Sequence, residues 1–235
     1  MKRYFIAFLI AGIIFSSGIL ILNTEVITRQ GINYEVRQIK IPLYLKVLDF
    51  MDRHYNYKSL TRKITENCKT QQDKVIKIFS WTYDNIKRQP GNLPVVDDHV
   101  WHIIVRGYGV DDQFQDVFTT LCNYAKVDSF FDYIYNNNKE RRKCLSFVKL
   151  NDRWTIFDVY NGVYFKNREG QIASIEDLSA GNWLLIREGN NIFDENYDTY
   201  FKRLRSYNYI DKKFSRPTLQ SPLRRFIFWC KGLFH

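Results

Sequence analysis

Residues 107–118, with the sequence GYGVDDQFQDVF, indicate most clearly how the chain folds. Gly107 and Gly109 permit backbone angles that other residues resist, which predicts a tight turn. Asp111 and Asp112 follow, and their negative charge suits the first turn of a helix. A helix is therefore expected over about residues 111–125. Its buried stripe would consist of Phe114, Val117, Phe118, Leu121 and Cys122.

Two more helices are expected before this turn. Thr70 can cap a helix over about residues 71–86, which ends before Pro90-Gly91. An earlier helix is expected over about residues 43–54, where apolar residues also recur at helical spacing.

Strand-like runs follow the turn and its helix. They cover residues 130–135, 143–150, 153–159 and 163–165. Asn151-Asp152 between the second and third runs predicts a hairpin. Helices followed by an antiparallel sheet make an α+β fold.

Three segments in this order resemble the transglutaminase-like family of the papain-like cysteine proteinase superfamily. They are IFSWTYDNI at 78–86, the turn and helix start at 107–118, and FVKLNDRWTIFD at 147–158. The resemblance covers about residues 70–165. It implies a papain/transglutaminase-like core in which N-terminal helices pack on an antiparallel sheet.

The resemblance also assigns positions to the three catalytic groups of the family, of which two differ here. Such chemistry needs a thiolate at the helix start, an imidazole base and a carboxylate that orients the imidazole. The cysteine position falls on Asp111. The histidine position falls on Lys143 without a gap, or on Cys144 with a one-residue shift. Only the third group, Asp158, is retained.

We therefore expect a pseudoenzyme that acts as a membrane-anchored, peptide- or glycan-binding scaffold protein. Its cleft would be lined by Trp101, Tyr108, Gly109, Asp111, Asp112 and Trp154. The alternative is an active cysteine-type hydrolase or acyltransferase with displaced residues. In that case Cys144 would be the nucleophile, with His99 or His102 as its base.

Two further alternatives concern other chemistry. His99 and His102 could converge on a metal ion, although the apolar residues between them favour a structural interpretation. Asp111, Asp112 and Asp158 could form a carboxylate cluster for acid–base work on glycosides. Neither alternative is favoured, and no cofactor is expected.

The N-terminus carries a long apolar run, Tyr4–Leu22, after Lys2 and Arg3. As a helix it would be about 28 Å long, close to the hydrocarbon thickness of a bilayer. No small-residue cleavage motif follows, so an uncleaved anchor is favoured over a signal peptide. The basic pair predicts a single-pass membrane protein whose domain lies outside the cytoplasm.

Composition limits the class of partner. The 235 residues are 45% hydrophobic and carry a net charge of +10, which allows a core and an anionic partner. The basic residues form no helical stripe and no zinc-finger spacing, which argues against nucleic acid. We expect the membrane as one partner and an unknown protein or glycan in the cleft as another. None of the four cysteines sits in a CxxC pair, so free thiols are expected.

Four segments organise the chain in this interpretation. They are an anchor (1–24), a polar connector (25–42), the transglutaminase-like domain (43–195) and a basic aromatic tail (196–235). Within the tail, residues 223–229 are typical of an interfacial amphipathic helix or of a helix that closes the domain.

Overall fold

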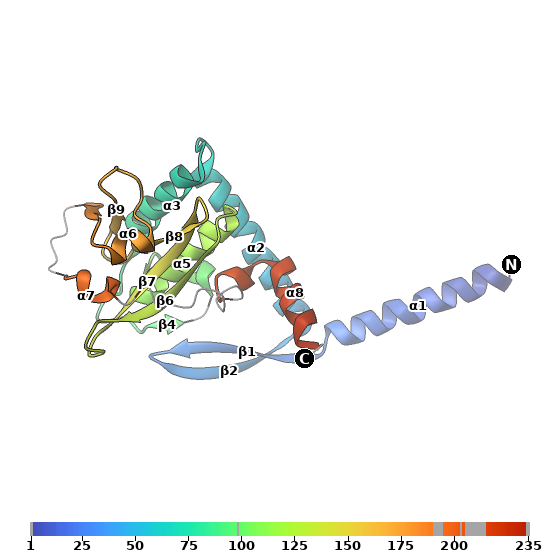
Figure 1. The fold of residues 1–235 in the computed structure, drawn as a ribbon. Helices are drawn as coiled ribbons and strands as arrows, with labels where there is room; N and C mark the ends of the chain where they lie inside the picture. Colours follow the sequence, from blue (N-terminus) through green and yellow to red (C-terminus); the bar gives the residue numbers. More distant parts are fainter. Residues whose placement is uncertain (1, 98, 190–194, 203, 205–214, 234–235) are drawn as a thin grey trace. The chain divides into compact units, whose positions relative to one another are not determined.

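The computed structural model describes residues 2–97, 99–189, 195–202, 204 and 215–233 (Figure 1). The chain divides into two units, Met1–Arg53 with Pro94–Asp98, and His54–Leu93 with His99–His235. The boundary falls inside helix α2, Leu43–Thr65. This helix continues well past the expected end near His54, so the division differs from the four segments drawn from the sequence.

The first unit begins with helix α1, Lys2–Leu22. Its stretch Tyr4–Leu22 is long and apolar enough to cross a membrane, and none of it is buried in the protein. Length and composition thus agree with an anchor.

The segment expected as a polar connector is a β-hairpin. Strands β1, Glu25–Ile32, and β2, Glu35–Pro42, pair antiparallel, and the short strand β4, Val96–Asp97, pairs with β1. Asn33 and Tyr34 join the strands with φ angles of 49° and 69°. Positive φ at both central residues is the geometry of a tight hairpin turn.

The second unit contains the expected helices. Helix α3, Gln71–Asn85, begins with a capping box between Thr70 and Asp73, and its expected apolar face is buried. Helix α4, Val100–Arg106, ends at Gly107 with φ 73°. Helix α5, Asp111–Tyr124, then starts at the expected residue, and its apolar stripe is buried.

A close backbone approach holds the turn before α5. Strand β5, Tyr108–Gly109, pairs parallel with β3, Lys87–Arg88. A Cβ atom at Gly109 would lie 2.7 Å from Oε1 of Gln113. A side chain at position 109 would therefore require Gln113 to shift, two residues after Asp111.

Five antiparallel strands form the main sheet, in the order β10-β9-β8-β7-β6. Asn151 and Asp152 join β7 and β8 with φ angles of 49° and 63°, which confirms the hairpin. The strands are β6 (Ser129–Tyr135), β7 (Arg142–Leu150), β8 (Arg153–Asp158), β9 (Val163–Lys166) and β10 (Leu184–Arg187).

The two faces of this sheet pack in different hydrophobic clusters. Val148 and Phe157 belong to a first cluster with residues of α3 and α5, such as Phe79 and Phe118. Leu145, Phe147 and Phe165 belong to a second cluster with residues of the short helices α6 (Ile175–Ser179) and α7 (Asp198–Phe201). Because side chains alternate along β7, one face of the sheet packs against α3 and α5 and the other face packs against α6 and α7.

The segment expected as a tail contains helical elements among its described residues. It contains α7, a 3₁₀ turn at Thr218–Gln220, and helix α8, Pro222–Leu233. Residues 203, 205–214 and 234–235 of this segment lie outside the described residues.

Candidate functional site

Asp111 is the first residue of α5, and its carboxylate reaches across to β7. Its Oδ1 accepts a hydrogen bond from Nε2 of Gln115 at 3.4 Å. The carboxylate also accepts a hydrogen bond from the backbone N–H of Cys144. Burial, helped by the negative charge of Asp158, raises the pKa of Asp111 to about 6. The hydrogen bonds and Lys143 oppose this rise without cancelling it. Asp111 therefore titrates close to neutral pH.

Lys143 and Asp158 form a buried ion pair. Nζ of Lys143 lies 3.1 Å from Oδ2 of Asp158 and 3.2 Å from Oε2 of Glu195. Asp158 is fully buried and Lys143 is 9% exposed. Burial alone would lower the pKa of Lys143, but the charges of Asp158 and Glu195 outweigh it and raise the pKa. The ammonium group is thus held in its charged form.

Further hydrogen bonds satisfy the Asp158 carboxylate. Oη of Tyr197 donates to Oδ2 at 2.6 Å, and Nδ2 of Asn161 donates to the same atom at 2.9 Å. The backbone N–H of Asn161 donates to Oδ1 at 3.2 Å. Together with Lys143, these groups leave the carboxylate fully engaged.

The two candidate base positions differ in their contacts with Asp158. Lys143, not Cys144, contacts Asp158. Cys144 pairs with Tyr133 of β6 and is fully buried. Burial, and then the charges of Asp111 and Asp112, raise the pKa of its thiol. The thiol is therefore protonated at neutral pH, which disfavours it as a nucleophile.

The two histidines lie at the other end of α4 from the turn. His99 occupies the N-cap of α4, and the ring of His102 lies 5.7 Å from it. The seven residues of α4 separate His99 from Gly107, and His102 is the third of those seven residues. Among the described residues, no group of three or more His, Cys, Asp or Glu side chains is arranged to hold a metal ion.

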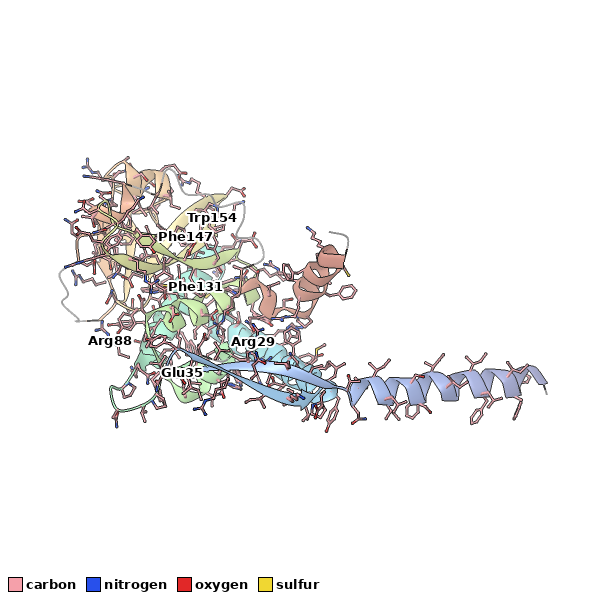
Figure 2. The ribbon with its side chains drawn as sticks, turned by 90° about the horizontal axis from the view of Figure 1, so that it is seen from below. Arg29, Glu35, Arg88, Phe131, Phe147 and Trp154 are labelled. Carbon is pink, nitrogen blue, oxygen red and sulfur yellow. The ribbon has the colours of Figure 1, made fainter. Side chains whose placement is uncertain are left out.

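Two expected cleft residues lie elsewhere. The ring of Trp101 packs edge-to-face on Tyr57 at 5.8 Å and belongs with the first cluster. Trp154 packs on Phe130 at 5.1 Å and lies near Phe147 in the second cluster (Figure 2). It pairs with Lys149 beside the β7–β8 turn, at the other end of β8 from Asp158. The sequence interpretation was wrong to place both tryptophans in one cleft.

Tyr108 and Gly109 precede Asp111 and contact Arg106 and Gln113. Nε of Arg106 donates to the Tyr108 carbonyl at 3.0 Å, and its guanidinium lies 5.8 Å from the Tyr108 ring centre. Nη2 of Arg106 also donates to Oε1 of Gln113, which packs against Gly109. These residues thus position the start of α5.

Sequence reasoning missed Gln115, Asn161, Glu195 and Tyr197. Oε1 of Gln115 accepts from Oγ of Ser146 at 2.7 Å and from the Val159 amide at 3.4 Å. It therefore ties α5 to β7 and to the chain after β8. Its spacing of four from Asp111 was a usable signal. Glu195 and Tyr197 follow Asp158 by too many residues for any local pattern to connect them.

A cavity of about 460 Å³ lies away from this network. None of the expected site residues lines it. Its lining consists of Asn67, Cys68, Lys69, Gln72, Asp73, Ile76, Lys77, Tyr164, Lys166 and Ile172.

One family model matches the middle of the chain. Residues 58–169 match the family described as "Transglutaminase-like superfamily". The chain is similar to a solved "putative cysteine protease" from Cytophaga hutchinsonii, with 18% identity and a TM-score of 0.38 over 57% of this chain and 46% of that one. A solved "putative protease" from Parabacteroides distasonis gives 15% identity and a TM-score of 0.39, over 53% of this chain and 28% of that one. The chain thus spans less than half the length of both proteins. A search of curated proteins found no match.

Proposed function

We propose that this chain, whose residues 58–169 form a transglutaminase-like domain, is a non-catalytic binding protein held at a membrane by its N-terminal helix. One observation carries the proposal. Asp111 and Lys143, which the resemblance places at the family's thiol and imidazole positions, carry a carboxylate and an ammonium group. Lys143 is engaged in an ion-pair network with Asp158 and Glu195.

The chemistry of these groups supports inactivity. Attack by the Asp111 carboxylate on an amide would give a mixed anhydride, a much more reactive acyl group than the amide it replaces. A general base must accept a proton near neutral pH. The raised pKa of Lys143 keeps its ammonium group protonated at neutral pH, so Lys143 cannot act as the general base.

The alternative cysteine-type enzyme is disfavoured by the surroundings of Cys144. Its thiol is buried, and the nearby carboxylates further disfavour the thiolate. A reactive cysteine needs the opposite environment, with cationic groups or an imidazole nearby.

The neighbouring sheet edge favours an extended peptide as the ligand. β6 forms one edge of the five-stranded sheet, and an edge strand can pair with an added peptide strand. Tyr133 on β6 is 36% exposed, and the Arg142 guanidinium lies 4.6 Å from its ring centre. Helix α5 contacts β6, so this edge lies beside the helix that begins at Asp111.

An activity assay on the full chain tests inactivity. Wild type should neither hydrolyse fluorescent casein nor couple dansylcadaverine to it. The double variant Asp111→Cys, Lys143→His should gain iodoacetamide reactivity at neutral pH. Asp111→Cys with Lys143→Met serves as the matched control, because it has the thiol without the imidazole. Casein turnover by wild type that Asp111→Ala abolishes would contradict the proposal.

A binding selection tests the ligand class. Displayed peptides selected on the full chain should lose roughly tenfold or more in affinity on Tyr133→Ala, as for a contact residue at an interface centre. Tyr34→Ala, at an 87% exposed tyrosine of the β1–β2 hairpin, should leave binding unchanged. If no peptide is selected and the chain binds on a glycan array, the ligand is a glycan and not a peptide.

A further inference from the structure

Helix α8 is fixed to the second unit by polar contacts at its start. Nη1 of Arg224 donates to Oδ1 of Asn123 at 3.1 Å, and Nη2 pairs with Oδ1 of Asp128 at 3.3 Å. Oη of Tyr124 donates to the Gln220 carbonyl just before the helix. Nε of Arg225 donates to the Leu219 carbonyl. The helix is thus attached, as expected for a closing helix.

Attachment does not bury the apolar side chains of α8. Leu223 is 68% exposed, Phe226 60%, Ile227 41% and Phe228 48%. Leu223, Phe226 and Ile227 are spaced three and four residues apart, so they lie on one side of the helix. A group of large apolar side chains on a surface marks an interaction site.

The charged residues within this segment are all basic, and two of them, Arg216 and Arg224, pair with Asp116 and Asp128 of the domain. Residues 215–235 contain Arg216, Arg224, Arg225 and Lys231 and no Asp or Glu. A second copy placed against the same side would bring like charges together, because a twofold interface pairs a surface with itself. An anionic surface would attract them. Apolar side chains flanked by Lys and Arg are the combination found in helices that lie in a membrane interface.

We propose that α8 lies in the headgroup region of an anionic bilayer, with Leu223, Phe226 and Ile227 directed to the acyl chains. This inference rests on the membrane location in the proposed function, because α1 would hold the chain at a bilayer. It adds a second, lipid-selective contact made by the folded domain itself.

A fluorescence experiment on the full chain tests this contact. NBD is attached to Ile227→Cys after the half-buried Cys68 and Cys230 are changed to Ser. The chain is reconstituted in phosphatidylcholine vesicles with or without about 30% phosphatidylglycerol. We expect a blue shift and a roughly twofold rise in emission only with the anionic lipid, reversed by about 0.5 M salt. Doxyl-labelled lipid should quench it. NBD at Leu184→Cys, a 59% exposed position on β10, is the matched control.

Two results would overturn the inference. NBD emission at position 227 that is the same in detergent, neutral and anionic vesicles would mean that α8 does not contact lipid. A blue shift already present in detergent, with cross-linking between copies, would mean that a second copy covers the helix. Flotation with neutral vesicles reports separately on α1. A chain that floats without the emission change contradicts only the α8 contact, whereas a chain that does not float contradicts the proposed anchor.

Discussion

Asp111 combines a favourable position at a helix start with a buried carboxylate. A carboxylate suits the N-terminus of α5, where the thiolate of a cysteine enzyme would also be favoured. Burial beside Asp158 nevertheless raises the pKa of Asp111 to about 6. The folded protein therefore keeps this carboxyl group protonated to a higher pH than the unfolded chain does.

This raised pKa predicts a pH-dependent effect of Asp111→Asn. The folded pKa exceeds the ordinary value of 3.8, so Asp111 costs no stability below about pH 4. Its cost grows between about pH 4 and pH 6 and is constant above that. The Asn variant should be more stable than wild type by about 1–2 kcal/mol above pH 6, and by nothing near pH 4. Urea unfolding in detergent at several pH values measures the difference. The exposed Glu169→Gln should show no such trend, and a pH-independent gain for Asp111→Asn would rule out the explanation.

The Lys143–Asp158 pair predicts a large loss from a single substitution. Lys143→Met leaves the fully buried Asp158 carboxylate without its cation, which should cost about 3 kcal/mol in unfolding free energy. Adding Asp158→Asn should recover part of that loss. Lys149→Met breaks the exposed pair with Asp152 and should cost no more than about 0.5 kcal/mol. Equal losses for the two lysine variants would show that burial does not set the strength of the pair.

Individual residues could be predicted only where a local pattern contained them. Asp111 begins the helix expected after a Gly-rich turn, and Asp158 lies at the end of an expected strand, so local patterns contain both residues. Glu195 and Tyr197 contact Lys143 and Asp158 through tertiary folding, which no spacing reveals. Trp101 and Trp154 were assigned to the cleft from their type, whereas packing placed them in separate clusters.

At the scale of elements, the turn before α5 depends on close packing at Gly109. An added Cβ would meet Oε1 of Gln113 at 2.7 Å and its Cβ at 3.0 Å. Gln113 would have to move and would weaken the hydrogen bonds that its Oε1 accepts from Arg106 and Val110.

We therefore expect Gly109→Ala to destabilise the second unit by about 1–3 kcal/mol. Thermal unfolding followed by circular dichroism measures the change. Gly91→Ala is the matched control, because no atom lies within 4 Å of its added Cβ. An unchanged midpoint for Gly109→Ala would show that Gln113 gives way without cost.

Elements were predictable where periodicity and turn chemistry agreed. α3, α5 and the β7–β8 hairpin combine a cap or turn with a regular apolar pattern, and all three form where expected. The β1–β2 hairpin was missed because its strands are mostly exposed and polar, although Asn33 at the turn was a usable signal. α2 was predicted too short because it continues across the boundary between the units, where its packing changes.

At the scale of the whole molecule, the proposed anchor fixes the side on which the domain lies. Lys2 and Arg3 precede Tyr4–Leu22, which predicts a cytoplasmic N-terminus. Protease added to intact cells or spheroplasts expressing the chain should therefore cleave the domain, while a cytoplasmic control protein stays intact. Cleavage that requires lysis would reverse the orientation.

Cys144 is also protected against oxidation by its surroundings. Oxidants attack the thiolate, and burial together with nearby carboxylates keeps this thiol protonated. Peroxide should modify the half-buried Cys68 well before Cys144 in mass-mapped peptides. Equal rates at the two cysteines would contradict this protection. A chain delivered to an oxidising compartment can thus keep the thiol beside Asp111 reduced without pairing it in a disulfide.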